Sequence, residues 1–285
     1  MTPVSPELEP HLEQAAQTVR DADTLYIGAG AGMGVDSGLP DFRGKEGFWK
    51  AYPPVAKLGL AFSEMANPRW FDEDPEFAWG FYGHRLNLYR ETTPHEGFCI
   101  LRKWEASMDG GAFVYTSNVD GHFQKAGFDR NQVIECHGSI NHMQCVENCG
   151  QEIWSAAKCE VEVDQSTLRA ALPLPTCPAC GQLARPNILM FGDWGWDSSL
   201  AGTQQTYHDN WLRQQKGRKM VVIEIGAGTY VPSVRIQCEG LAVDYETTLI
   251  RINLREFDAP TDNVSLPLGG LAALQHIDAI LDDMQ

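Results

Sequence analysis

Four of the eight cysteines form two close pairs along the chain. Cys145 and Cys149 have three residues between them, and Cys177 and Cys180 have two. Each pair places two thiolates on one turn, and two such turns complete a tetrahedral zinc site. A site whose four ligands are all protein stabilises the fold and leaves no position open for catalysis. The spacing therefore predicts a structural zinc ion, with Cys159 as an alternative ligand because the first pair is wider than usual.

Two glycine-rich turns each follow a short apolar run. The first turn, residues 28–34, follows residues 24–27, and the second, residues 226–228, follows residues 220–225. Small residues let backbone N–H groups approach a pyrophosphate. The first turn departs from the dinucleotide fingerprint, because Met33 holds the third glycine position and no acidic residue ends a strand about 20 residues later. One such turn is also compatible with an ordinary strand-to-helix connection, but two in one sheet favour a large nucleotide.

Polar side chains follow two further apolar runs. Asn118 and Asp120 come just after residues 112–116, and His137 comes just after residues 132–135. In an open parallel sheet, ligands bind beyond the carboxyl ends of the strands. We therefore expect these side chains to converge on whatever the glycine turns hold. A histidine there is suited to act as a general base near neutral pH, and a hydrogen-bonded structural histidine is an equal alternative.

A further pair of polar side chains lies in an aromatic segment. Residues 76–90 follow Pro75 and are predicted to form a helix. Tyr82 and Arg85 are three positions apart, which places both on one face of that helix. An arginine fork beside a tyrosine hydroxyl is well suited to bind a carboxylate. A core tyrosine next to a surface arginine is the alternative.

The elements that must position these residues are predicted to form an α/β fold. The four runs named above and those at residues 187–191 and 248–252 are apolar almost throughout, as expected for strands covered on both faces. Helical patterns separate several of them, and Glu7–Arg20 is amphipathic. This alternation predicts an open parallel, Rossmann-like sheet.

Two segments interrupt the alternation and are predicted to form a smaller inserted lobe with helical and zinc-binding parts. They are the aromatic segment 42–89 and the cysteine-rich segment 145–180. The predicted larger lobe comprises residues 1–41, 92–140 and 185–285, and the smaller lobe comprises residues 42–91 and 141–184.

Composition limits the classes of partner. The chain has 22 Lys and Arg residues against 38 Asp and Glu residues, a formal charge of −16. Such a balance argues against nucleic acid or an anionic membrane as partner, whereas a cationic peptide remains compatible. The N-terminal segment has no basic region followed by an apolar run, and no run approaches the ~20 apolar residues of a membrane span. We therefore expect a cytoplasmic protein that does not enter membranes, and the sequence does not predict its oligomeric state.

Taken together, the motifs resemble those of the sirtuin family. They occur in the family's order between residues 28 and 253, and as a set they are far more specific than any one of them. The matching segments are GAGAGMGVDSGLPDFRG (28–44), TSNVDGHFQKAG (116–127), ECHGS (135–139), the four paired cysteines, RPNILMFGD (185–193), IGAG (225–228) and RIN (251–253).

The resemblance implies that the protein uses NAD to remove acyl groups from protein lysines. The implied products are nicotinamide, O-acyl-ADP-ribose and lysine. His137 would be the general base on a ribose hydroxyl, and Asn118 and Asp120 would lie in the nicotinamide pocket. Because sirtuins consume NAD and transfer no hydride, the missing acidic residue is explained. The positions that would contact NAD are Gly28, Ala29, Gly30, Asp41, Phe42, Arg43, Ser117, Gly226, Ala227 and Asn253.

The resemblance also implies how a substrate would bind. The backbone around Phe191, Gly192 and Val231 would pair with an extended acyl-lysine peptide, as in β-strand addition. Tyr82 and Arg85 resemble the pair by which some sirtuins prefer succinyl-lysine or malonyl-lysine over acetyl-lysine.

The sequence departs from the family pattern in places. Ser117 stands where the family commonly has Gln, Asp193 where it has Glu, and residues 226–228 read Gly-Ala-Gly instead of Gly-Thr-Ser. Three alternatives to deacylation remain. The same pocket could hydrolyse NAD or transfer ADP-ribose, the chain could be a zinc-stabilised nucleotide sensor without turnover, or it could be a hydride-transferring oxidoreductase.

Overall fold

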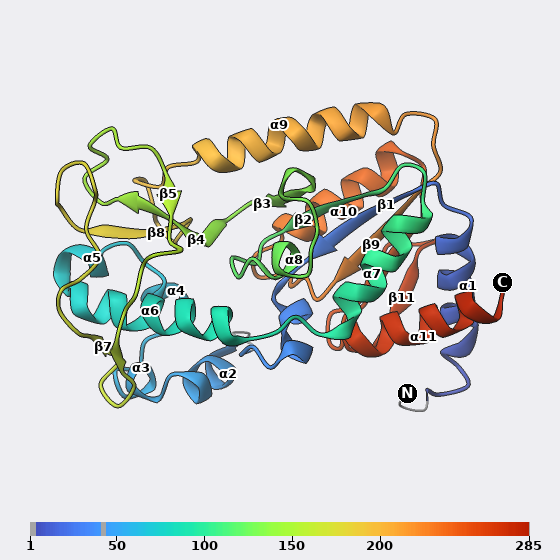
Figure 1. Ribbon diagram of the computed structural model, residues 1–285. Helices are drawn as coiled ribbons and strands as arrows, with labels where there is room; N and C mark the ends of the chain where they lie inside the picture. Colours follow the sequence, from blue (N-terminus) through green and yellow to red (C-terminus); the bar gives the residue numbers. More distant parts are fainter. Residues whose placement is uncertain (1–3, 41–43, 285) are drawn as a thin grey trace.

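The computed structural model describes residues 4–40 and 44–284, and a six-stranded parallel sheet forms the core of its larger part, on the right in Figure 1. The strand order is β11-β10-β9-β1-β2-β3, and each neighbouring pair is parallel. This is the order of a doubly wound, Rossmann-like sheet, which confirms the predicted fold class. The strands are β1 (Thr24–Ala29), β2 (Ala112–Thr116), β3 (Val133–Glu135), β9 (Met220–Ile225), β10 (Leu249–Ile252) and β11 (Val264–Leu266).

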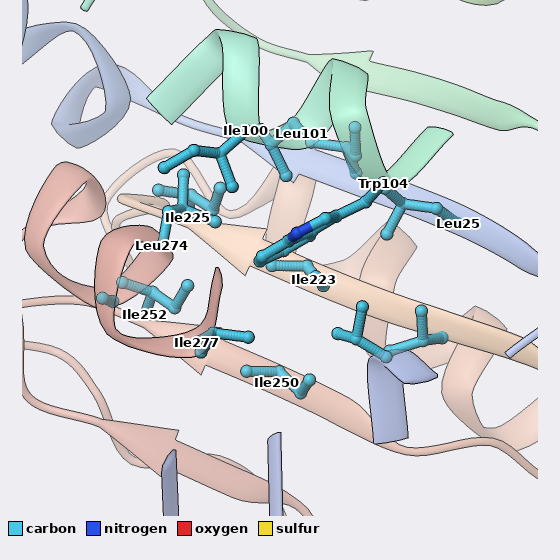
Figure 2. Close-up of a cluster of buried hydrophobic side chains, with 14 of the residues drawn as sticks. Leu25, Ile100, Leu101, Trp104, Ile223, Ile225, Ile250, Ile252, Leu274 and Ile277 are labelled. Atoms are coloured by element: carbon cyan, nitrogen blue, oxygen red, sulfur yellow. The ribbon is translucent and has the colours of Figure 1, made fainter. Parts of the chain in front are cut away.

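Helices cover both faces of this sheet. The strands are buried on each side because alternate residues pack in opposite directions: Leu25 and Ile27 belong to one hydrophobic cluster and Tyr26 to another. Figure 2 shows the first cluster, in which Trp104 and Ile277 lie over the strands. Each fully buried side chain of this kind contributes about 1.5–3 kcal/mol. The helices on that face are α1 (Glu9–Arg20), α7 (Glu96–Ser107) and α11 (Gly270–Asp283), and those on the opposite face are α9 (Ser199–Gln214) and α10 (Ser233–Asp244).

One ion pair lies inside the sheet itself. Arg251 of β10 donates two hydrogen bonds, of 2.7 and 2.8 Å, to the carboxylate of Glu224 on β9. Both residues are fully buried, with 1% and 0% exposure. Arg251 also donates to Glu239 on α10 at 2.6 Å and to the carbonyl of Asp258 at 2.6 Å. Two charges inside apolar strands are therefore tolerated because each satisfies the other.

We expect Arg251→Met to destabilise the protein by about 3–5 kcal/mol, because it leaves the Glu224 carboxylate buried without its main partner. Urea unfolding followed by circular dichroism measures the loss. Glu239→Gln is the matched control: Glu239 contacts the same guanidinium, but its side chain is 40% exposed, so the expected change is about 1 kcal/mol or less. Equal stability of Arg251→Met and the unmodified protein would show that the pair contributes nothing.

The second region combines helices with small antiparallel sheets and has its own aromatic core. Phe48, Tyr52, Trp79 and Phe81 are fully buried in it. Its helices are α2 (Gly44–Ala51), α3 (Pro53–Lys57), α4 (Phe62–Met65), α5 (Trp70–Glu73) and α6 (Pro75–Glu91). Its strands are β4 (Gly138–Cys145), β5 (Trp154–Ser155) and β8 (Ala184–Ile188) in the order β5-β4-β8, with the hairpin β6 (Val163–Asp164) and β7 (Arg169–Ala170).

One predicted strand belongs to a different sheet. The apolar run at residues 187–191 was expected in the parallel sheet, but β8 ends at Ile188 and pairs antiparallel with β4. The sixth strand of the parallel sheet is instead β11, which the sequence reasoning did not find. An apolar run shows that a strand is buried on both faces, but it does not show which sheet buries it.

The helices bear on the prediction that the protein does not enter membranes. Within residues 4–40 and 44–284, none of the helices is long and apolar enough to cross a membrane. Short elements that complete the connections are the 3₁₀ helices η1 (Ala31–Ser37) and η2 (Arg130–Gln132) and the helix α8 (His122–Lys125).

Candidate active site and metal centre

The two glycine-rich turns lie side by side at the point where the strand order reverses. The N–H of Gly30 donates to the carbonyl of Ile225 at 2.9 Å, and the N–H of Gly32 donates to the carbonyl of Gly226 at 3.0 Å. A Cβ on Gly30 would lie 2.6 Å from the Cα of Ala227, and one on Gly226 would lie 2.5 Å from Gly32. The glycines are therefore needed for the turns to pack against each other. This position is where open α/β sheets bind their ligands.

A cavity of about 650 Å³ opens beside these turns. Gly30, Ser117 and Ala227, all predicted to contact NAD, line it. Thr229, Arg255 and Glu256 add hydroxyl, guanidinium and carboxylate groups to its lining, and Thr229 donates to the Glu256 carboxylate. Its other lining residues are Ala31, Ala61, Phe62, Ser63, Phe191, Gly228, Tyr230 and Val231.

A second cavity, of about 320 Å³, adjoins the first and shares Ala31, Phe62, Ser117, Phe191 and Val231 with it. The structure brings Asn118, Asp120 and His137 together on its wall. Other residues that line it are Gly34, Leu39, Pro40, Ala66, Tyr82, Arg85, Tyr89, Val119, Ile188, Leu189 and Met190.

Asn118 and Asp120 are held by the loop that follows β2. The Asn118 side chain donates to the carbonyl of Gly30 at 2.9 Å, which ties this loop to the first glycine turn. One carboxylate oxygen of Asp120 accepts from the N–H of His122 at 2.9 Å, at the start of α8. Because β2 and β3 are adjacent and pair Thr116 with Glu135, the loops after both strands open onto the same cavity.

His137 is half-buried, and its environment keeps the imidazole neutral. Burial lowers its pKa, and a hydrogen bond with the Ser117 backbone raises it by a smaller amount. Its Nε2 lies 3.3 Å from the hydroxyl oxygen of Ser233, the first residue of α10. Sequence reasoning missed Ser233, and no local signal marks it, because it is 96 positions from His137. A neutral imidazole on the cavity wall is a competent general base.

Several predicted cofactor residues lie outside both cavity walls. Gly28 is inside β1, where a Cβ would lie 2.2 Å from the Sγ of Cys238, so its small size serves packing. Ala29 is also buried within β1, and Gly226 serves the packing of the turns. Cofactor contact by these residues stays a prediction. Asp41, Phe42 and Arg43 lie outside the described residues.

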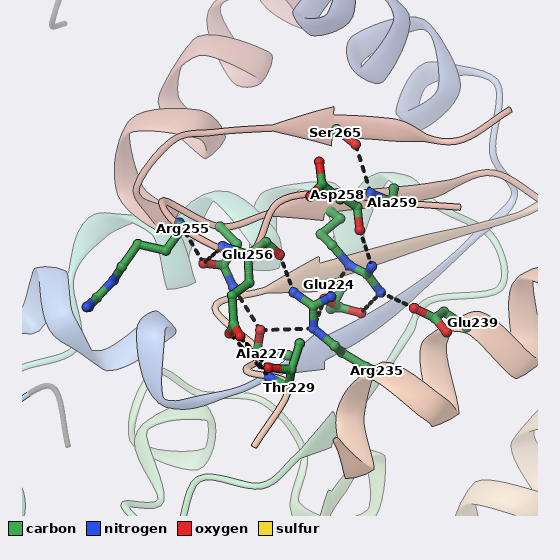
Figure 3. A network of polar contacts seen from close by, with 12 residues as sticks. Glu224, Ala227, Thr229, Arg235, Glu239, Arg255, Glu256, Asp258, Ala259 and Ser265 are labelled. Carbon is green, nitrogen blue, oxygen red and sulfur yellow. Dashed lines mark hydrogen bonds and ion pairs between the residues drawn. The ribbon is translucent and has the colours of Figure 1, made fainter. Parts of the chain in front are cut away.

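Asn253 holds the backbone of three residues that line the first cavity. Its side chain donates to the carbonyl of Ala227 at 2.7 Å and accepts from the N–H groups of Arg255 at 3.1 Å and Glu256 at 3.2 Å. Arg235, which sequence reasoning missed, donates to the same Ala227 carbonyl at 3.3 Å and to the carbonyl of Glu256 (Figure 3). The Gly-Ala-Gly turn lacks hydroxyls, and these side chains hold it by its backbone.

Tyr82, Arg85 and Tyr89 from α6 also line the second cavity. The predicted pair thus faces one cavity, and Arg85 is only 6% exposed, which excludes the surface arginine of the alternative. The Tyr82 hydroxyl is buried and has no hydrogen-bond partner among the described residues. Sequence reasoning missed Tyr89, although its position four residues after Arg85 on the same helix could have revealed it.

The predicted peptide-binding segment is partly occupied by the chain itself. The N–H of Phe191 donates to the carbonyl of Ala66 at 2.9 Å, and its carbonyl accepts from the Asn67 side chain at 3.0 Å. A peptide would therefore pair with Gly192 and the residues after it, or with Val231. Gly192 is exposed with φ of 70°, and Val231 is 38% exposed.

Asp193 fixes the loop that carries this segment. Its carboxylate is fully buried, pairs with Arg185, and accepts from the N–H groups of Met190 and Gly195, each at 3.2 Å. The side chain of the intervening Trp194 is 99% exposed. The shorter acid found here therefore serves a structural role that needs its buried partner.

The four paired cysteines converge at one point. All four Sγ atoms lie within 4.8 Å of one another. The Sγ atoms of Cys145 and Cys180 are 3.6 Å apart, and those of Cys149 and Cys177 are 3.7 Å apart. A tetrahedral zinc with Zn–S bonds of about 2.3 Å places its sulfurs about 3.8 Å apart, so the donor set fits. Cys159 is not a member of this cluster, and its carbonyl instead accepts from Arg90 at 2.7 Å.

Comparisons with known proteins relate the chain to one family. Residues 30–211 match the model of the Sir2 family. An NAD-dependent protein deacylase from Aquifex aeolicus is 36% identical over 164 residues, which cover 58% of this chain and 59% of that protein. NAD-dependent protein deacylase 1 from Archaeoglobus fulgidus is 34% identical over 185 residues, which cover 64% of this chain and 65% of that protein.

Solved structures show the same fold over nearly the whole chain. A mutant Sir2 homologue in complex with ADP-ribose has a TM-score of 0.68 at 25% identity and covers 95% of this chain and 97% of its own. A Sir2 homologue in complex with NAD has a TM-score of 0.71 at 24% identity, with coverage of 96% and 95%. In sequence, the chain matches less than two thirds of the length of the two deacylases. The family match itself extends over more than half of the chain, and the protein belongs to the Sir2 family.

Proposed function

We propose that this protein is an NAD-dependent protein-lysine deacylase that prefers acyl groups ending in a carboxylate. The observation that carries the proposal is a single cavity whose wall holds both His137 and the buried Arg85. The Sir2 relatives named NAD-dependent protein deacylase support the reaction class.

The two adjoining cavities fit NAD and an acyl-lysine side chain. Residues of the two glycine turns, with Thr229 and Arg255, would hold the adenosine and pyrophosphate half, and Ser117 would lie near the nicotinamide half. NAD, when bound, supplies a ribose carbon that accepts the acyl oxygen as nicotinamide leaves. With one water molecule consumed, the products would then be nicotinamide, O-acyl-ADP-ribose and the unmodified lysine.

The chain's own residues have three tasks in this reaction. Asn118 is anchored to Gly30 and would orient the nicotinamide end, and Asp120 lies beside it on the same wall. His137 would take the proton of a ribose hydroxyl at Nε2, the ring nitrogen 3.3 Å from Ser233. Leu189 and Met190, which line the same cavity, would give the acyl chain apolar contacts.

We also infer that the cysteine cluster holds one structural zinc ion per chain. The sulfur distances fit a tetrahedral thiolate site, and each of the four ligands belongs to the protein. Zinc there would stabilise the fold of the module that carries β4 and β8, and β8 lines the second cavity at Ile188.

The decisive experiment is a panel of acetyl-, malonyl- and succinyl-lysine peptides incubated with NAD, with products identified by mass. Deacylated peptide and O-acyl-ADP-ribose are the expected products. Nicotinamide released at a rate that peptide does not raise would instead indicate NAD hydrolysis or ADP-ribosyl transfer. Absorbance of reduced cofactor would reveal hydride transfer, which is not expected.

We expect Arg85→Met to lower kcat/KM for a succinyl peptide about 10- to 100-fold while leaving the acetyl peptide within a few-fold of its original rate. Hydrogen bonds to a charged group are worth about 1.5–3 kcal/mol, and methionine keeps the apolar volume of the site. Steady-state kinetics with both peptides measure the effect. Arg69→Met, at an exposed arginine of the same region, serves as control. Unchanged rates for both peptides in Arg85→Met, with acetyl the better substrate, would refute the acyl preference.

A further inference from the structure

Tyr89 contacts the guanidinium of Arg85 directly. Its hydroxyl oxygen accepts from the Nε of Arg85 at 3.0 Å and from Nη2 at 2.8 Å. Tyr89 is 5% exposed, and both side chains line the cavity of about 320 Å³. The two residues are one helical turn apart on α6, so the contact is built into a single rigid element.

These hydrogen bonds fix one edge of the guanidinium. Nε and Nη2 form this edge of the planar fork, and the Tyr89 oxygen lies across it. Nη1 lies outside this edge. A carboxylate binds an arginine most strongly through two parallel hydrogen bonds to one edge of the fork. Tyr89 thus orients the fork before any ligand arrives, which lowers the entropy lost on binding.

Tyr89 is a neutral partner for the guanidinium, so these two hydrogen bonds do not themselves cancel the charge of Arg85. Burial raises the pKa of Tyr89, and the positive charge of Arg85 offsets part of that rise. A phenol hydroxyl therefore satisfies two buried donors of Arg85 without cancelling the guanidinium charge. A carboxylate in its place would cancel that charge. The rings of Phe81, Tyr82 and Tyr89 lie 5.3 to 5.8 Å from the guanidinium carbon and further restrict its position.

Tyr89 also borders the groups that surround the nicotinamide end. The Asp120 carboxylate is close enough to raise the pKa of Tyr89, and the ring of His122 is 6.5 Å from the Tyr89 ring, nearly edge-on. The Tyr82 hydroxyl, without a partner among the described residues, lies on the same cavity wall and can donate to an incoming carboxylate.

We propose that Tyr89 is a positioning residue that fixes the Arg85 fork and so makes the cavity selective for acyl groups with a terminal carboxylate. This inference rests on the proposed deacylase function and goes beyond the Tyr82–Arg85 pair. Tyr89 does not touch the reacting atoms; it acts on the substrate through Arg85.

The test compares Tyr89→Phe with the unmodified protein on acetyl and succinyl peptides. We expect the KM for the succinyl peptide to rise about tenfold with kcat within twofold, and both constants for the acetyl peptide to stay within twofold. Tyr89→Gln, whose amide oxygen can accept the same bonds, should recover part of the loss. Tyr245→Phe, which removes a tyrosine hydroxyl bonded to the Leu212 carbonyl far from the cavity, is the control.

A double variant shows whether the effect passes through Arg85. In an Arg85→Met background, adding Tyr89→Phe should change the succinyl KM by less than twofold. An acetyl KM that rises as much as the succinyl KM, or a Tyr89→Gln variant no better than Tyr89→Phe, would overturn the inference. If the unmodified protein shows no preference for succinyl peptides, the acyl preference of the proposed function fails first. If that preference is present and Tyr89→Phe retains it, only the role of Tyr89 is refuted.

Discussion

Replacing His137 by alanine should lower the kcat/KM of NAD-dependent deacylation by about 10²- to 10⁴-fold, the usual contribution of a positioned general base. NAD affinity should change little, because the wall of the 650 Å³ cavity does not include His137. Peptide kinetics and direct NAD titration measure the two effects separately. His142→Ala is a suitable control. His142 is also half-buried, but it is not among the residues that line either cavity.

The pH dependence gives a second readout of the same residue. Burial lowers the pKa of His137 below its ordinary value of 6.5, so the imidazole stays unprotonated further into the acidic range. The rate of the unmodified protein should therefore fall at a lower pH than the ordinary histidine pKa of 6.5 would predict. The His137→Ala variant should lack this acidic limb. A His137→Ala variant that behaves as the unmodified protein in every NAD assay would instead favour a nucleotide sensor without turnover.

Cys177→Ser should remove the metal and unfold the cysteine-rich module. The apparent free energy of zinc binding to structural thiolate sites is about 10–16 kcal/mol, as large as the whole stability of a typical domain. Zinc content should fall from about one per chain to near zero, and amide exchange should increase across residues 141–184. Because β8 lines the second cavity at Ile188 and pairs with β4, the proposed deacylation should be lost as well.

Cys159→Ser provides the matched control and settles the alternative ligand. Cys159 lies in the same module but outside the cluster of four sulfurs, so zinc content and activity should both be retained. Loss of zinc in this variant, with normal zinc in Cys177→Ser, would require a different ligand set.

Much of the sheet could be predicted because its strands are short and apolar, and because glycine turns follow two of them. The runs at residues 24–27 and 220–225 both became central strands, and their turns meet as expected. Glu224 lies in one such run and Arg251 in another, and a buried strand does not hold a lone charge. The sequence contains both residues but not their pairing, which depends on β9 and β10 being neighbours.

The candidate site was predictable where one short motif carries it. Asn118 and Asp120 follow one strand, and the cysteines identify each other by spacing. Ser233 and Tyr89 escaped for different reasons: Ser233 meets His137 only through the folded sheet, whereas Tyr89 looked like one more aromatic residue in an aromatic helix. Their roles depend on which side chain each hydroxyl meets, and hydrophobic periodicity contains no such information.

The close packing of the two glycine turns has a consequence for synthesis of the chain. Gly30 leaves the ribosome early, but its hydrogen-bonding and packing partners, Ile225 and Ala227, follow almost two hundred residues later. Until then, the wall between the turns does not exist. A nucleotide held there can therefore stabilise only a chain whose β9 has already joined β1, so nascent chains must reach this stage without help from the ligand.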